Sequence, residues 1–199
     1  KELKAACSTC TECGLHKKRH NVVFGSGNPN ARILFVNDFP NYIDDKYGVP
    51  MLGDDGRIFN AMLSTFGITR NQDMPDECEI FVANAVMCHP GRGREGQILE
   101  PSKRTINTCK HWLEETIYAI DPIVVVAMGK AASISLVGSG AVTQNIGSLH
   151  IVDIPGVFKP IRVPVVVIPN PAFLVRDNNN DSNGYSAWTK WTLQELYRQ

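Results

Sequence analysis

Short, continuously apolar runs alternate along this chain with stretches whose apolar residues recur at helical spacing. The apolar runs fall at residues 33–36, 80–83, 123–127 and 163–168, and runs of this length are typical of strands buried on both faces. Helical spacing is found at residues 58–66, 102–120 and 185–197, with a further helix of small residues after residue 130. Because strands and helices alternate, we predict an α/β fold, a three-layer α/β/α sandwich around a central parallel four-stranded sheet.

The rest of the chain adds connections rather than a second folding unit. Residues 1–13 are compatible with a short helix that ends at Gly14. Residues 37–53 are rich in turn-forming residues and are expected to be loops. With no internal repeat and no linker, residues 1–199 are interpreted as one domain, either a whole protein or a fragment of a longer chain.

Composition narrows the class of protein without defining its function. The 199 residues are 43% apolar and 20% charged, which are values of a globular chain. No run of about 18 apolar residues predicts a membrane span, and no signal peptide is visible after Lys1. The formal net charge of zero argues mildly against a protein that coats nucleic acid, although a local basic face is compatible with it.

Six cysteines without a secretion signal favour an intracellular, reducing compartment, where metal binding is commoner than disulfide formation. Cysteine ligation suits both a tetrahedral zinc ion and an iron–sulfur cluster. The alternative is a set of buried free thiols, which the crowding of the first three cysteines makes less attractive. The N-terminal run is Cys7, Cys10 and Cys13, Cys88 and Cys109 stand far away, and Cys78 is interpreted as a bystander in a polar loop.

Polar residues follow the predicted strands where each of them ends. Asn37 and Asp38, Asn84, and Asn170 occupy these positions. The carboxyl ends of parallel strands share one edge of the sheet, which is where open α/β sheets build ligand sites. Taken singly, each residue is equally explained as a turn former beside proline, but three strand ends together indicate a site.

Two basic segments are candidates for phosphate contacts. Lys17, Lys18 and Arg19 form one cluster, and a glycine-flanked loop carries Arg92 and Arg94. Arginine and lysine in such loops commonly bind the DNA backbone. A solvated charged face explains the same pattern, so these residues alone predict little.

Six short motifs are spread over nearly the whole chain, and together they resemble one known family. The motifs are Cys10-x2-Cys13, Val22-Val23-Phe24-Gly25-x-Gly27-Asn28-Pro29, Gly48-x-Pro50, Asn84-x-Val86-x-Cys88-x-Pro90, Cys109-x2-Trp112-Leu113 and Pro171-Ala172-Phe173-Leu174-x-Arg176. In this combination the chain resembles the family 4 uracil-DNA glycosylases, the iron–sulfur branch of the uracil-DNA glycosylase superfamily. The resemblance implies a uracil-DNA glycosylase-like fold.

The resemblance also implies a cofactor and its ligands. By position, Cys10, Cys13, Cys88 and Cys109 would ligate a [4Fe–4S] cluster. Cys7 would then be an extra thiol outside the ligand set.

The implied activity is the removal of a base that has been flipped out of DNA. Asn84 would read the uracil edge, with Asp38 and Asn170 as catalytic residues that stabilise the sugar cation and the departing base. Leu174 would be the wedge that fills the vacated stack, and Arg176 would contact a phosphate.

Three departures from the family pattern all fall on the wall of the expected pocket. Asp38 replaces a glutamate, with the bulkier Phe39 and Asn41 at neighbouring positions where the family has small residues. Met51 stands where an aromatic residue stacks on the base, and Asn170 stands in place of a histidine. These changes indicate either a base other than plain uracil or weakened catalysis.

We therefore carry three hypotheses forward. The first is a DNA glycosylase that acts on uracil or a related modified base in single- or double-stranded DNA. The second is a non-catalytic DNA-binding module of the same fold, as a monomer or as a domain of a larger replication or repair protein. The third is a scaffold for protein partners that holds zinc in place of iron.

Overall fold

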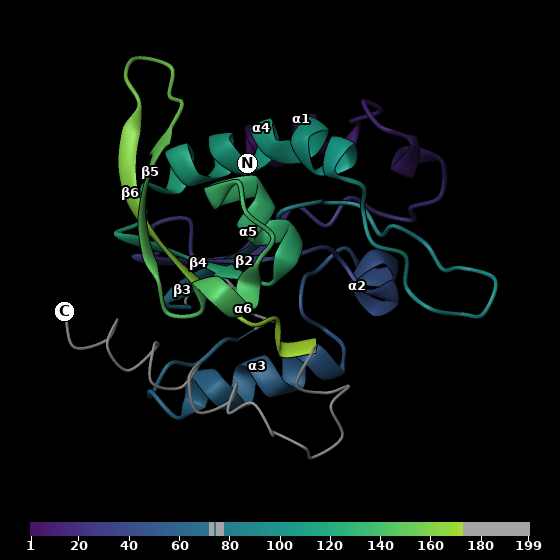
Figure 1. Cartoon of the computed structure of the whole chain (residues 1–199), viewed down its shortest axis with the longest axis horizontal. Coiled ribbons are helices and arrows are strands. Elements are labelled where there is room, and N and C mark those ends of the chain that lie inside the picture. Colours follow the sequence, from purple (N-terminus) through teal and green to yellow (C-terminus); the bar gives the residue numbers. More distant parts are fainter. Residues whose placement is uncertain (72–73, 75–77, 173–199) are drawn as a thin grey trace.

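The computed structural model describes residues 1–71, 74 and 78–172, which form one mixed β-sheet with helices on both of its faces (Figure 1). The strands of the described part lie in the order β1-β3-β2-β4-β6-β5. The four inner strands are mutually parallel, whereas each edge strand runs antiparallel to its neighbour. The strands are β1 (Gly25–Gly27), β2 (Ile33–Asn37), β3 (Ile80–Asn84), β4 (Val124–Met128), β5 (Leu149–Ile154) and β6 (Ile161–Ile168).

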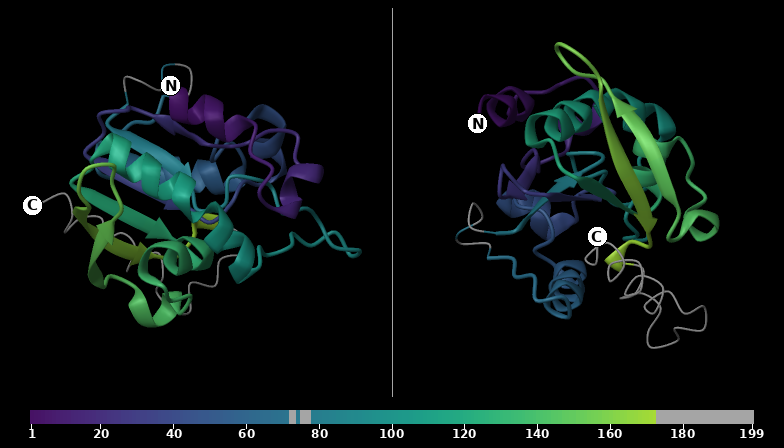
Figure 2. Two further views of the ribbon diagram at one scale, coloured as in Figure 1. Left: turned by 90° about the horizontal axis from the view of Figure 1, so that it is seen from above. Right: turned by 90° about the vertical axis from the view of Figure 1, so that its left-hand side faces the viewer.

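The helices of the described residues cover the sheet from two sides. In Figure 1, α1 and α4 lie above the sheet and α3 lies below it, and the views of Figure 2 show the same layering. No helix in this part of the chain is both long and apolar enough to cross a membrane. The helices are α1 (Glu2–Ser8), the 3-10 helix η1 (Gly14–Lys17), α2 (Tyr42–Tyr47), α3 (Asp54–Ser64), α4 (Lys103–Ile120), α5 (Lys130–Val137) and α6 (Val142–Asn145).

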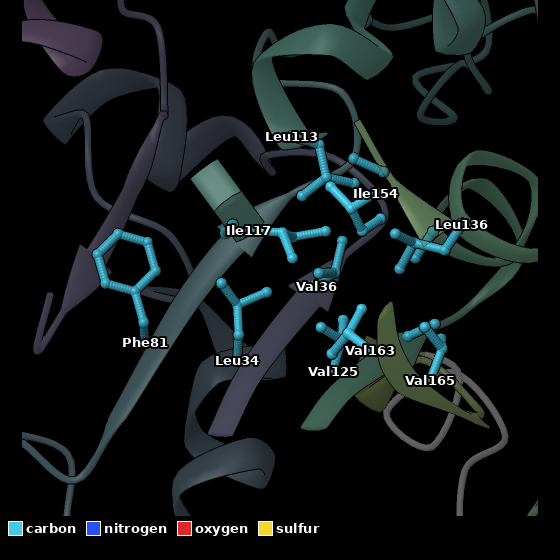
Figure 3. Close-up of a cluster of buried hydrophobic side chains, with 14 of the residues drawn as sticks. Leu34, Val36, Phe81, Leu113, Ile117, Val125, Leu136, Ile154, Val163 and Val165 are labelled. Atoms are coloured by element: carbon cyan, nitrogen blue, oxygen red, sulfur yellow. The ribbon is translucent and has the colours of Figure 1, made fainter. Parts of the chain in front are cut away.

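Successive side chains of the inner strands point to opposite faces of the sheet, so each face has its own hydrophobic core. Leu34 and Val36 of β2 pack with Leu113 of α4 in the larger cluster (Figure 3). Phe35, between them in sequence, points to the opposite face and meets Phe59 of α3, with ring centroids 5.0 Å apart. Because both faces are covered, every residue of β3 and β4 is buried, which explains their continuously apolar sequences.

The strand register aligns the strand ends that the sequence marked as polar. Asn37, the last residue of β2, pairs with Asn84 on one side and with Met128 on the other. Met128 in turn pairs with Ile168, which is the last residue of β6. The carboxyl ends of the four inner strands therefore form one level edge.

The predicted α/β architecture with four parallel inner strands is confirmed, and the edges of the sheet were not foreseen. The strand β1 is Gly-Ser-Gly and has no apolar signal, while β5 alternates on an exposed edge with only Ile154 buried. Asn41 and Asp44 cap α2 reciprocally inside a region that we predicted to be loops. The N-terminal helix ends at Ser8, earlier than predicted. The helix predicted at residues 185–197 lies outside the described residues.

Replacing Phe59 by alanine tests the core beneath the sheet. Phe59 is fully buried against Phe35, so Phe59→Ala is expected to lower the free energy of unfolding by about 3–5 kcal/mol. Denaturant unfolding of the variant and of a Tyr47→Ala control, whose side chain is 61% exposed, measures the difference. Equal losses in the two variants would contradict this packing.

Candidate functional site

The polar residues at the carboxyl edge form one hydrogen-bonded line. Asn170, just beyond β6, donates from Nδ2 to Oδ1 of Asn37 at 2.9 Å. Asn37 donates from its own Nδ2 to Oδ1 of Asn84 at 3.0 Å. Asn84 donates to the carbonyl oxygen of Val23 at 2.9 Å. The structure therefore brings together the three strand ends that the sequence singled out.

The Asp38 side chain points instead to the N-terminus of α5. Its Oδ1 accepts the backbone N–H of Ala132 at 2.9 Å, and its Oδ2 accepts from Asn170 at 3.0 Å. A carboxylate is favoured at a helix N-terminus by the unpaired N–H groups there. The close approach needs Gly129, because a Cβ at that position would lie 2.1 Å from Oδ2 of Asp38.

Burial is the largest influence on the pKa of Asp38. Withdrawal from water raises the pKa of this carboxyl to about 6, against a partly opposing effect of the hydrogen bonds from α5 and Asn170. At neutral pH Asp38 is therefore mostly an anion, and it becomes neutral in mildly acidic solution.

A cavity of about 570 Å³ opens at this edge of the sheet. Asn37, Asp38 and Asn170 form its polar floor, and apolar residues such as Ile106 and Ile134 form walls. The volume falls within the range of small-ligand sites, and so does the mixture of apolar walls with a few convergent polar groups.

The predicted base-binding residues divide between the cavity and the protein interior. Phe39 and Asn41 both line the cavity, and Asn41 is held there by its bonds to Asp55 at 3.0 and 3.2 Å. Asn84 is fully buried behind Asn37 and does not line the cavity. Met51, also absent from the cavity wall, is fully buried in the core beneath the sheet. The base-binding roles of Asn84 and Met51 stay predictions, and this arrangement gives neither side chain direct access to the cavity.

The predicted DNA-contacting residues lie beside the cavity or beyond the described chain. Arg92 and Arg94 are exposed on the loop of residues 91–101, whose Ile98 and Glu100 reach the cavity wall. Glu100 forms an exposed ion pair of 2.8 Å with Lys130 at the cavity. Leu174 and Arg176 lie outside the described residues.

A second, smaller hollow gathers five of the six cysteines. It lies where the segment after α1 and the loop after β3 meet α4. Burial raises the pKa of both the Cys88 and the Cys109 thiols, that of Cys109 to about 12. The cysteines that line it are Cys7, Cys10, Cys13, Cys88 and Cys109.

N–H donors point at three of these sulfurs. Arg19 donates from Nη1 to Cys88 at 3.3 Å, and the Trp112 indole donates from Nε1 to Cys10 at 3.4 Å. The Met87 backbone N–H donates to Cys109 at 3.5 Å. Donors of this kind stabilise thiolates and tune clusters that thiolates ligate.

The cysteine hollow offers several sulfur donors of the kind that zinc and iron–sulfur clusters both use. Within the described residues, no three His, Cys, Asp or Glu side chains converge closely enough to hold one metal ion. Cysteine sulfurs with N–H donors around them are also the usual surroundings of an iron–sulfur cluster, so the donor set is compatible with one.

Some of the contributing residues were missed by the sequence analysis. The hollow also holds Cys7, the extra thiol outside the predicted ligand set, which is buried there with its sulfur 3.4 Å from that of Met87. Arg19 belonged to a basic cluster with no hint of its sulfur contact. Gly129 also escaped notice, although its position between a strand and a helix was a usable signal.

These features define an α/β ligand-binding protein. The sheet is mostly parallel with a cavity at its carboxyl edge, and a cysteine-lined hollow beside it is a candidate metal centre. The chain belongs to the uracil DNA glycosylase superfamily, whose family profile matches residues 24–193. The resemblance noted in the sequence is thereby confirmed.

Individual relatives fall in one branch of the superfamily. The chain is 32% identical over 174 residues to a type-4 uracil-DNA glycosylase of Thermotoga maritima, covering 86% of this chain and 81% of that protein. A protein of the same name from Pyrobaculum aerophilum is 24% identical, with 88% of this chain and 84% of the relative covered. Another from Archaeoglobus fulgidus is 30% identical, over 63% of this chain and 57% of the relative.

The burial of Asp38 predicts that the stability difference between the protein and its Asp38→Asn variant depends on pH. Its pKa is raised in the folded state to about 6, so the stability it contributes is fully present below about pH 4 and is lost as the pH rises through about 6. Asp38→Asn removes this dependence. Relative to that of the unsubstituted protein, the free energy of unfolding of the variant should rise by up to about 3 kcal/mol between about pH 4 and about pH 8.

Thermal unfolding of both proteins at the two pH values measures this change. The altered hydrogen bonding of the amide acts at both pH values and cancels in the comparison. A stability difference that is the same at both pH values would show that Asp38 is not a buried, titrating carboxyl.

Proposed function

We propose that the protein is a DNA glycosylase that hydrolyses the N-glycosidic bond of uracil or a related modified base. The observation that carries the proposal is the cavity at the carboxyl edge, with Asp38 and Asn170 on its floor, in a chain of this superfamily. A nucleotide must leave the stack before its glycosidic bond can be reached, and an enclosed cavity receives it.

Asp38 has the electrostatics that this reaction needs. Bond cleavage develops positive charge on the sugar, and an anion fixed at the cavity floor stabilises that charge. Asp38 can also accept a proton from an attacking water, a role that suits a pKa of about 6. Its carboxylate is held by Ala132 and Asn170, so it is already oriented before the base arrives.

Asn170 and the cavity wall complete the proposed site. The Asn170 amide would donate to the departing base after giving up one of its bonds to Asn37 and Asp38, without the positive charge that a histidine can carry. Phe39 and Asn41 would shape the wall and set the size of the accepted base. Asn84 and Met51 would reach a base only after a rearrangement, because both side chains are buried here.

DNA would be held around the mouth of the cavity. Arg92 and Arg94 sit on the exposed loop that borders it and would bind phosphates. Leu174 and Arg176 are proposed as the wedge and a phosphate contact. An intracellular protein, acting as a monomer or as part of a larger repair protein, would suit this function and the cysteine chemistry.

Cys10, Cys13, Cys88 and Cys109 are proposed to hold a [4Fe–4S] cluster. When bound, the cluster would link three segments of the chain: the stretch after α1, the loop after β3 and α4. The residues around the hollow would then support it, with Arg19 and Trp112 donating to the ligand sulfurs. Cys7 would remain a neighbouring thiol.

A non-catalytic DNA-binding module is the second candidate, because the polar groups of the edge are hydrogen-bonded to one another. Asn170 already donates to both Asn37 and Asp38. Such a floor is compatible with a pocket that holds a base without cleaving its bond.

A panel of oligonucleotides separates the two candidates. Duplexes and single strands with uracil, 5-hydroxymethyluracil, hypoxanthine or xanthine are incubated with the protein and then with alkali. We expect strand breaks at one or more of these bases, and roughly 10²–10³-fold slower cleavage by Asp38→Asn, which loses the charge. Binding without breaks on every substrate would favour the module.

Cysteine variants test the cluster separately from activity. Cys88→Ala should lose iron and acid-labile sulfide, because one corner of the cluster loses its ligand. Cys78→Ala is the matched control, since Cys78 is equally buried but bonds to Asn71 outside the hollow. Iron and sulfide per chain are measured after anaerobic purification. Stoichiometric zinc, or iron retained in Cys88→Ala, would contradict the assignment.

A further inference from the structure

Asn37 occupies the centre of the polar edge and uses nearly all of its hydrogen-bonding capacity there. Its amide hydrogens go to Oδ1 of Asn84 and to the carbonyl oxygen of Phe39, each at 3.0 Å. Its Oδ1 accepts from Asn170 at 2.9 Å. The side chain is 2% exposed, yet it lines the cavity. It is therefore a fixed part of the floor.

The bonds of Asn37 make the Asn84 amide unavailable to a base in the cavity. A base edge that presents an N–H donor beside a carbonyl acceptor needs an amide with a free acceptor and a free donor. The Oδ1 of Asn84 already accepts from Asn37, and one of its two Nδ2 hydrogens is donated to Val23. Burial behind Asn37 keeps the rest of the amide out of the cavity. The bond to Val23 also fixes which way the amide faces, so its oxygen points to Asn37 and not into the cavity.

We propose that Asn37 is a specificity-determining residue, which covers Asn84 and thereby weakens selection for bases with a uracil-like donor–acceptor edge. The inference rests on the proposed function, because it concerns the base that enters the cavity. Asn37 acts through Asn84 and is thus a positioning residue, one whose removal exposes a base-reading amide.

Cytosine is the natural comparison for uracil in this test. Uracil presents an N–H donor at N3 and a carbonyl acceptor at C4, whereas cytosine presents an acceptor and an amino donor at the same two positions. An uncovered Asn84 oxygen, held in one orientation by Val23, pairs with the first edge and clashes electrostatically with the second. Single-stranded oligonucleotides remove the difference in duplex stability between the two bases.

The experiment measures binding to oligonucleotides that cannot be cleaved. Each carries one 2′-fluoro-deoxyuridine or one 2′-fluoro-deoxycytidine. The readout is the dissociation constant for the cytidine oligonucleotide divided by that for the uridine oligonucleotide. We expect a ratio below about 3 for the unsubstituted protein and at least about 10 for Asn37→Ala, the gain of one good amide–base pair. In Asn37→Ala/Asn84→Ala the ratio should return to its original value.

Two further variants keep the test decisive. Asn30→Ala removes an exposed asparagine and should leave the ratio unchanged. Asn37→Ser, whose single hydroxyl cannot replace both donated bonds, is used if Asn37→Ala does not fold, and it should shift the ratio in the same direction.

The outcomes distinguish this inference from the proposed function. An unchanged ratio in folded Asn37 variants, or a gain that survives the loss of Asn84, overturns the role of Asn37 even if the protein excises a base. A ratio of about 10 or more in the unsubstituted protein also overturns it, since Asn84 would then be reading the base already. If neither the protein nor its variants bind either oligonucleotide, both the inference and the proposed function fall.

Discussion

The hydrogen bonds of Asn37 are the constraint on which the candidate site depends. They join the ends of β2 and β3 to the segment after β6, so three chain regions are held together at this edge, with Asn37 and Asn170 facing the cavity. The same bonds satisfy buried polar atoms that would otherwise cost about 1–3 kcal/mol each. Stability and selectivity are therefore coupled at this edge, because opening Asn84 to a base means leaving polar groups of the floor without partners.

The cysteine hollow and the cavity are built from adjoining residues. Cys88 lies four residues beyond Asn84, and Cys109 lies three residues beyond the cavity residue Ile106 on α4. Anything bound by the cysteines would fix the loop after β3 and the start of α4 relative to each other. The proposed cluster would therefore support the shape of the cavity.

The sequence was most informative where burial is complete. The inner strands are continuously apolar because both faces are covered, so their number and direction were predictable. The edge strand β1 contains only glycine and serine, and no pattern of apolar residues could reveal it. In the site, the polar residues at the strand ends were predicted from their position after each apolar run. The bond between Asn37 and Asn84 was not, because it depends on a strand register that the sequence does not specify. Spacing alone also could not show that Cys7 shares the hollow with the four proposed ligands.

Hydrogen exchange of the asparagine side-chain amides, followed by NMR in the free protein, reports directly on whether Asn37 covers Asn84. We expect the Nδ2 hydrogens of Asn37 and Asn84 to exchange at least about 100-fold more slowly than those of the exposed Asn30, because they are buried and bonded within the edge. Exchange as fast as that of Asn30 would mean that the edge is open to solvent and that Asn37 does not cover Asn84.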